Sequence, residues 1–173
     1  MNIIGLGNAG CQIAMGFEKY GSYNIFCIDT VNKGYTSYLK VKEQNSHEEY
    51  EKNYRKLKLS KCSAETTIIV GGAGNISGCT LRLLQQLKEN KLTVIYIKPD
   101  VTQLTEDRRK KHKITFGILQ QYARSNVYEN LYVVSNKKVE EIVEELSLKN
   151  YWDDINNIIS STYHMINVFK NNE

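Results

Sequence analysis

Proline and tryptophan occur once each among the 173 residues, and the chain lacks several features that would define a class of protein. No apolar run approaches the roughly 20 residues that cross a bilayer. The amino terminus enters an apolar run directly, without the charged segment that opens a secretion signal. These absences predict a cytoplasmic protein with no membrane partner.

Cysteine and histidine are too few and too scattered to indicate a metal centre or a catalytic triad. The four cysteines show no C-x-x-C spacing, and the three histidines lie far apart in the sequence. Because no secretion signal is present, we expect reduced thiols rather than disulfides. The residues concerned are Cys11, Cys27, Cys62 and Cys79, with His47, His112 and His164.

Composition and charge are those of an ordinary globular domain. Hydrophobic residues make up 41% and charged residues 24% of the chain, and the net charge of +4 does not by itself imply nucleic acid. Basic residues concentrate at 55–61 and 108–113. We interpret these runs as solvated helix faces, with an acidic partner surface or nucleic acid as the alternatives. The length predicts one domain over residues 1–173.

Seven of the 11 glycines lie in two short stretches, at residues 3–13 and 67–78. Each stretch begins as an apolar run and continues into a helical pattern. Glycine allows positive φ angles and a close approach of the backbone to a ligand, and a helix N-terminus adds unpaired N–H groups and partial positive charge. Two such loops in one domain suit a nucleotide polyphosphate.

Apolar runs alternate with helical patterns along the chain. The runs at about 2–5, 23–28, 66–70, 92–97 and 130–134 predict buried parallel strands, and the helical patterns cover about 9–20, 77–89, 105–124, 137–146 and 151–170. The polar segment 31–63 is less regular, with one predicted helix around 48–56. This alternation predicts an α/β fold, a Rossmann-like three-layer parallel sheet with helices on both faces.

The first glycine stretch also matches the dinucleotide fingerprint. Gly5-x-Gly7-x-x-Gly10, with Asp29 at the end of the second strand, raises the hypothesis of an NAD-dependent oxidoreductase. The sequence offers no histidine or Tyr-x-x-x-Lys where hydride transfer needs a proton donor, and a common NAD domain has no need of a second phosphate loop. No G-x-x-x-x-G-K-[ST] pattern is present, so the chain is not a P-loop protein.

Five motifs in order resemble the tubulin and FtsZ family. Residues 7–13 are similar to the first tubulin nucleotide loop, G-Q-[AC]-G-x-Q-I, and residues 71–78 resemble the signature G-G-G-T-G-[ST]-G. Residues 98–110 are similar to the FtsZ stretch R-P-F-x-x-E-G-x-x-R, and residues 131–136 are similar to its next strand, L-I-V-I-P-N. Trp152 and Asn156 resemble the aromatic and Asn/Asp residues that begin the central helix of the family. The resemblance implies a nucleotide-binding domain with strand order about 3-2-1-4-5, ending in the long central helix.

The same resemblance implies that each matching residue helps to bind GTP or GDP, with Mg²⁺ as a candidate ion bound together with the nucleotide. The phosphates would be held by Gly7, Asn8, Ala9, Gly72, Ala73, Gly74, Asn75, Ser77 and Gly78. Gln12 would reach toward the base or the phosphates. Glu106 would accept hydrogen bonds from the ribose, with Lys110 or Arg109 nearby. Asn136 and Asn156 would hold the guanine edge, and Trp152 would stack on the base.

Departures from the family pattern predict weak or absent GTP hydrolysis, and we assign no catalytic residue and no metal ligand. Ile76 stands where the signature has glycine, and the segment 42–49 has no glycine where FtsZ senses the terminal phosphate. Glu48 and Glu49 would repel that phosphate. In the family, a C-terminal domain supplies an acidic residue to the neighbouring subunit's hydrolytic site, and this sequence shows no such domain.

A second hypothesis is that the protein retains this fold but does not bind a nucleotide. A structural or adaptor protein would bind no cofactor and would act through self-association or a protein partner, with nucleic acid not expected. The richness in Lys, Asn, Ile and Tyr is common where coding DNA is AT-rich, as in some bacteriophages. A phage-encoded protein would reside in the host cytoplasm or the virion.

Overall fold

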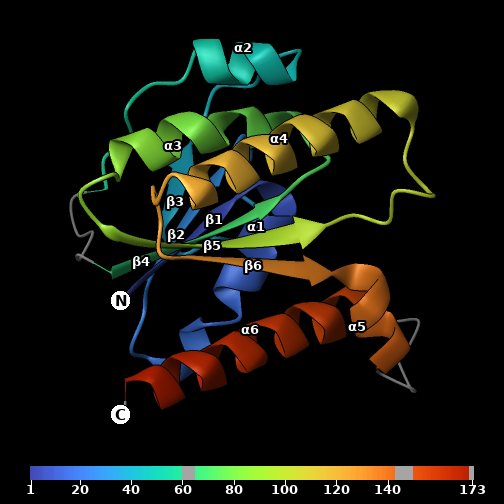
Figure 1. The fold of residues 1–173 in the computed structure, drawn as a ribbon. Coiled ribbons are helices and arrows are strands. Elements are labelled where there is room, and N and C mark those ends of the chain that lie inside the picture. Colours follow the sequence, from blue (N-terminus) through green and yellow to red (C-terminus); the bar gives the residue numbers. More distant parts are fainter. Residues whose placement is uncertain (60–64, 143–149, 172–173) are drawn as a thin grey trace.

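The computed structural model describes residues 1–59, 65–142 and 150–171, and its centre is a six-stranded sheet (Figure 1). Every neighbouring pair of strands is parallel, and the strand order is β3-β2-β1-β4-β5-β6. The strands are β1 (Asn2–Leu6), β2 (Asn24–Asp29), β3 (Tyr38–Lys40), β4 (Glu65–Gly71), β5 (Lys91–Lys98) and β6 (Asn130–Ser135).

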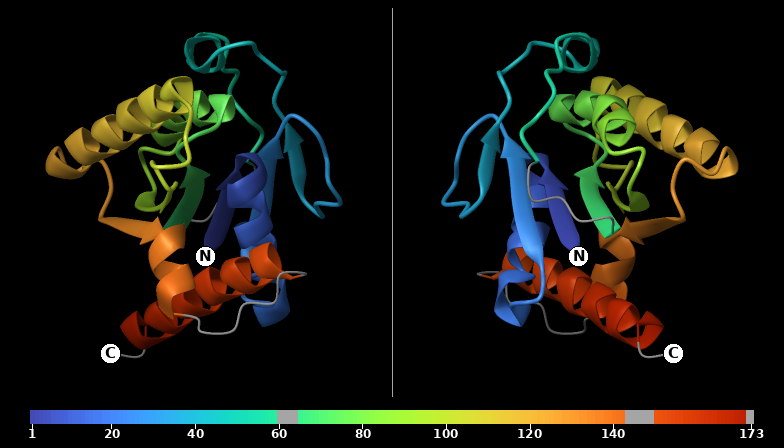
Figure 2. Two further views of the ribbon diagram at one scale, coloured as in Figure 1. Left: turned by 90° about the vertical axis from the view of Figure 1, so that its right-hand side faces the viewer. Right: turned by 90° about the vertical axis from the view of Figure 1, so that its left-hand side faces the viewer.

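Helices cover both faces of the sheet, which gives three layers. On one face lie α2 (His47–Lys52), α3 (Thr80–Gln86) and α4 (Glu106–Arg124); on the other lie α1 (Gly7–Met15), α5 (Asn136–Ile142) and α6 (Tyr151–Lys170) (Figures 1 and 2). Two short 3-10 helices, η1 (Glu18–Tyr20) and η2 (Asn75–Cys79), complete the described elements.

Each face of the sheet has its own hydrophobic core, and together the two cores explain why the central strands read as continuous apolar runs. Ile4, Ile68 and Val94 point into the core beneath α3 and α4. Ile3 and Ile69, one residue away along the same strands, point into the core beneath α1 and α6. Strands buried on both faces have no polar side to alternate with the apolar one.

The predicted fold class is confirmed, and the observed strand order 3-2-1-4-5-6 contains the order 3-2-1-4-5 that the family resemblance implies. The five apolar runs correspond to β1, β2, β4, β5 and β6. The strand that sequence patterning missed is β3, which is three residues long and lies in the irregular segment 31–63. Its residues are half-buried or exposed, so it has no apolar run to reveal it.

Helix ends differ from the predictions by a few residues. The predicted helix 9–20 divides into α1 and η1, and η1 ends at Gly21 in the left-handed region. The predicted helix 77–89 begins as the 3-10 turn η2, and the helix predicted at 48–56 ends at Lys52. Of the helix predicted at 137–146, residues 143–146 lie outside the described residues.

The described cysteines are buried free thiols, as expected; Cys62 lies outside the described residues. Burial raises the pKa of the Cys79 thiol to about 12. Among the described helices, none combines the length and apolar character that a bilayer crossing requires.

Candidate functional site

A cleft of about 680 Å³ opens at the carboxyl ends of the central strands, where both glycine loops begin. It joins segments that are far apart in the sequence: the start of α1, the loop after β4, the start of α4, and the first residues of α5 and α6. Ten of the fifteen predicted site residues line it: Gly7, Asn8, Ala9, Gln12, Gly72, Ala73, Gly74, Asn136, Trp152 and Asn156.

In the first glycine loop, Gly7 and Gly10 are required for different structural reasons. Gly7 has φ +70°, in the left-handed region that favours glycine. Gly10 packs so tightly that an added Cβ would lie well within 3 Å of the Ile69 carbonyl oxygen on β4. This close packing sets α1 against the sheet with its N-terminus at the cleft.

The first turn of α1 is open to an anion. Leu6, the N-cap residue, provides no side-chain hydrogen bond to the helix, and the first turn contains no acidic residue. Asn8 accepts a 2.9 Å hydrogen bond from Lys33 Nζ, which brings a positive charge to the loop. The N-terminus of α1 therefore lacks the side-chain cap and the carboxylate that would compete with a phosphate.

The second glycine loop lies directly over a buried tyrosine. A Cβ on Gly72 would overlap the hydroxyl of Tyr96, and that hydroxyl lies 2.6 Å from Nδ1 of His112. Ala73 and Gly74 continue the loop along the cleft wall. Gly72 is thus required by the packing beneath the loop.

Ile76 occupies space between the two glycine loops. Its side chain lines the cleft, and its Cγ2 atom lies 2.6 Å from where a Cβ on Gly7 would be. It also packs against the core beneath α3. The cleft is therefore narrower here than one with glycine at this position.

Three residues of the second loop turn away from the cleft. Asn75 donates to the Asn45 carbonyl at 3.3 Å, and the Ser77 hydroxyl donates to the Gly74 carbonyl at 2.7 Å. A Cβ on Gly78 would overlap the His47 carbonyl oxygen of α2. These residues hold the loop in shape and against α2 and the segment before it, and none of them lines the cleft.

The two α4 residues expected at the ribose also lie outside the cleft lining. Glu106 and Lys110 are exposed and form a salt bridge with each other at 3.0 Å. Arg109 donates from Nε to the Val101 carbonyl at 3.0 Å. The α4 residue that lines the cleft is Arg108, which sequence reasoning missed. Leu104, which precedes the N-cap of α4, lines it too, and no local sequence signal distinguished Arg108 from its neighbours.

At the opposite wall, polar and aromatic side chains meet at the starts of two helices. Trp152 and Asn156 lie one turn apart on α6, and Trp152 is 60% exposed. Asn136 begins α5, and its side-chain oxygen Oδ1 is buried without a hydrogen-bond partner among the described residues. A buried acceptor of this kind is costly unless a ligand or water satisfies it.

Asp29 serves the protein interior rather than this cleft. Its carboxylate accepts hydrogen bonds from the Thr30 amide at 2.8 Å and from the Tyr35 hydroxyl at 3.5 Å. It is 7% exposed and does not line the cleft. The geometry therefore gives the NAD hypothesis no ribose-binding acid at this position.

Two buried histidines beneath the second loop predict an acid-sensitive fold. Burial lowers the pKa of both His47 and His112 below the ordinary value of 6.5. The two imidazoles therefore bind protons more readily in the unfolded chain than in the folded protein. The full stability is present above about pH 6.5, and the free energy of unfolding falls as the pH decreases. We expect the unfolding free energy to drop between about pH 7 and pH 5, by at most about 1.4 kcal/mol per pH unit for each histidine.

Chemical denaturation across this range tests the expectation. The variant His47→Gln keeps a side chain that can bond to Thr115, whose hydroxyl lies 3.1 Å from His47 Nε2, but cannot titrate. Its stability should fall less steeply with acid than that of the unsubstituted protein. Identical slopes in the two proteins would show that His47 does not contribute.

Histidine, cysteine and acidic side chains do not gather in groups of three or more that could hold a metal ion anywhere in the described part of the chain, so no protein-built metal site is indicated there.

Comparison with models of known protein families found no match, and a search of curated proteins found none either.

Proposed function

We propose that this protein binds a guanine nucleotide in the cleft, in the manner of the tubulin and FtsZ nucleotide-binding domains that its motifs resemble. The observation that supports this most is the convergence of both glycine loops on one cleft with Trp152, Asn136 and Asn156 at its other wall. Phosphate-binding and base-binding groups then lie at opposite sides of a single cavity of suitable size.

The phosphates are assigned to the glycine loops. The open N-terminus of α1 and the backbone of Ala73 and Gly74 offer N–H donors, and Arg108 and Lys33 supply positive charge. Asp153 is the sole carboxylate among the described residues that line the cleft. Mg²⁺ would therefore be held chiefly by the phosphates and water, and we expect hydrolysis to be slow.

The base is assigned to the opposite wall. An asparagine side chain both donates and accepts, which suits the guanine edge. The Asn136 oxygen has no partner among the described residues and needs a donor such as the guanine N1–H or amino group. Trp152 offers an exposed indole face for stacking. Asn156 and Gln12 complete the polar lining.

Intrinsic fluorescence provides the direct test, since Trp152 is the single tryptophan of the chain. We expect GTP and GDP to change its emission in a saturable way and to raise the melting temperature, because they bind the folded state only. ATP should act far more weakly. The nucleotide content of natively purified protein, released by denaturation, gives an independent measurement.

A structural protein without nucleotide is the second candidate, and the position of Ile76 against Gly7 is the observation that favours it. It predicts empty purified protein and no response of fluorescence or melting temperature to saturating GTP and GDP. That result would overturn the nucleotide proposal.

A further inference from the structure

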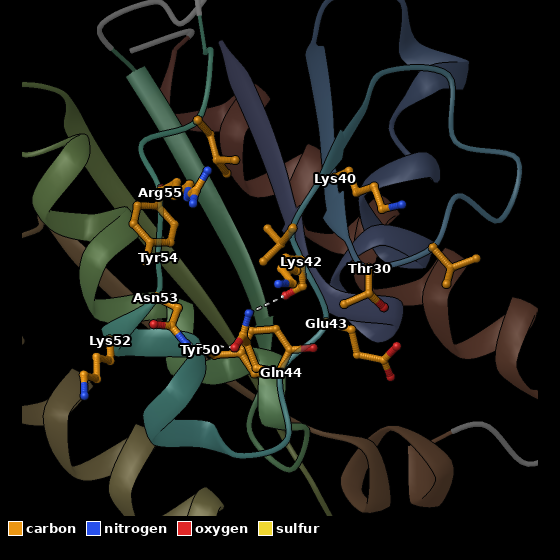
Figure 3. Close-up of a pocket in the computed structure, with 13 residues that line it drawn as sticks. Thr30, Lys40, Lys42, Glu43, Gln44, Tyr50, Lys52, Asn53, Tyr54 and Arg55 are labelled. Carbon is orange, nitrogen blue, oxygen red and sulfur yellow. Dashed lines mark hydrogen bonds between the residues drawn. The ribbon is translucent and has the colours of Figure 1, made fainter.

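A second cavity, of about 1130 Å³, lies apart from the cleft and shares no lining residue with it. Its two sides come from the segments before and after α2. Figure 3 shows Lys40, Lys42 and Glu43 on one side and Tyr54 with Arg55 on the other. We call this cavity the basic groove; its lining includes the cations Lys40, Lys42, Lys52 and Arg55.

The charge of the basic groove is not balanced within the described structure. Among the described residues that line it, Glu43 is the one carboxylate, against four cations. These four side chains are on exposed residues, and none of them lies within 4 Å of a described carboxylate. The groove therefore presents uncompensated positive charge to a ligand.

The groove exists because none of the described helices covers this part of the sheet. On the face that α3 and α4 cover elsewhere, the irregular stretch 53–59 runs beside β2 and β3 in place of a helix (Figure 2). The basic run at 55–61 is therefore not a helix face over its described residues 55–59, contrary to our sequence interpretation. Its residue Arg55 instead forms one side of the groove.

One wall of the groove is held in place by α3. The side chain of Gln86 donates to the Leu57 carbonyl at 2.8 Å and accepts from the Leu57 amide at 3.0 Å. The same Gln86 oxygen accepts from the Tyr54 hydroxyl at 2.6 Å. At the α2 end, Asn53 donates to Gln44 at 2.8 Å and links the two sides. A wall fixed before binding reduces the ordering cost of a ligand.

The shape and lining favour a peptide over a nucleic acid. Sequence-tolerant binding of single strands uses exposed aromatic faces for stacking, whereas Tyr50 is 4% exposed and Tyr54 is half-buried with its hydroxyl bound to Gln86. Val41 and Leu57 give the groove apolar surface. Its rim includes Lys40 of β3, the outermost described strand, where an extended chain can pair.

We infer that the basic groove binds an acidic, extended peptide segment of a partner protein. The carboxylates of that segment lie against Lys42 and Arg55, and its apolar side chains face Val41 and Leu57. This site is independent of the nucleotide proposal, since the two cavities have no residue in common.

Fluorescence anisotropy with a short labelled peptide, in which glutamate alternates with threonine and valine, tests the inference on the full chain. The double variant Lys42→Glu/Arg55→Glu should bind the peptide at least about tenfold more weakly. The matched control is Lys88→Glu/Lys91→Glu, which changes the net charge equally at a different surface pocket, near the start of β5. The control should bind like the unsubstituted protein.

Three outcomes would overturn the inference: no binding of the peptide, equal weakening in both double variants, or tighter binding of a labelled single-stranded DNA through Lys42 and Arg55. Equal melting temperatures for the two double variants would establish that loss of binding does not reflect loss of fold. The nucleotide titration of Trp152 should be unchanged in both, which separates this site from the cleft.

Discussion

Replacing Gly10 with alanine should lower the free energy of unfolding by about 3 kcal/mol or more. The added methyl group would overlap the backbone carbonyl of Ile69, and backbone atoms of a central strand cannot rotate away as a side chain does. Helix α1 would have to move off the sheet and loosen the core that contains Cys11 and Ile13. For a chain of this length, the melting temperature should fall by about 6–12 °C.

The same substitution at Gly117 is the control. Gly117 lies within α4, and a Cβ built there meets no atom within 4 Å. Alanine should therefore stabilise the protein by up to about 1 kcal/mol, through its higher helix propensity. Equal melting temperatures for Gly10→Ala and the unsubstituted protein would contradict the close contact between α1 and β4.

Charge reversal at Arg108 should have the largest effect on nucleotide affinity. A hydrogen bond to a charged group contributes about 1.5–3 kcal/mol, and a glutamate would add repulsion between like charges. We expect Arg108→Glu to weaken GTP binding about 100-fold, measured by titrating Trp152 fluorescence. The fold should be little affected, since Arg108 is exposed and has no described salt bridge.

Arg109→Glu provides the matched control for that experiment. This variant makes the same change of charge one residue further along α4. The Arg109 side chain donates a hydrogen bond to the Val101 carbonyl and does not line the cleft. Its affinity for GTP should stay within a few-fold of the unsubstituted protein. An equal loss in both variants would mean that Arg108 acts only through the overall field of the helix.

The part of the site that follows the strands directly could be predicted from the sequence. Gly7, Gly72 and Asn136 each come at or just after the end of an apolar run, and the carboxyl ends of parallel strands meet at one edge of a sheet. Trp152 and Asn156 reach the same edge because their i, i+4 spacing places both on one face of α6.

The predicted site residues that do not line the cleft lie on elements whose orientation the local sequence does not determine. Glu106, Arg108 and Lys110 occupy neighbouring positions on α4, and only the rotation of that helix on the core decides which one faces the cleft. Ser77 and Gly78 match a phosphate-loop pattern equally well, but the packing of η2 against α2 and α4 turns them inward.

The sequence by itself therefore determined the α/β class, the order of strands and helices, and the two glycine loops, because burial on both faces and backbone conformation leave local signatures. Only the tertiary structure decided the edge strand β3, the place of Arg108 in the cleft and the basic groove beside β2 and β3. These features depend on which surfaces other elements cover, and that coverage arises from contacts between residues distant in the chain.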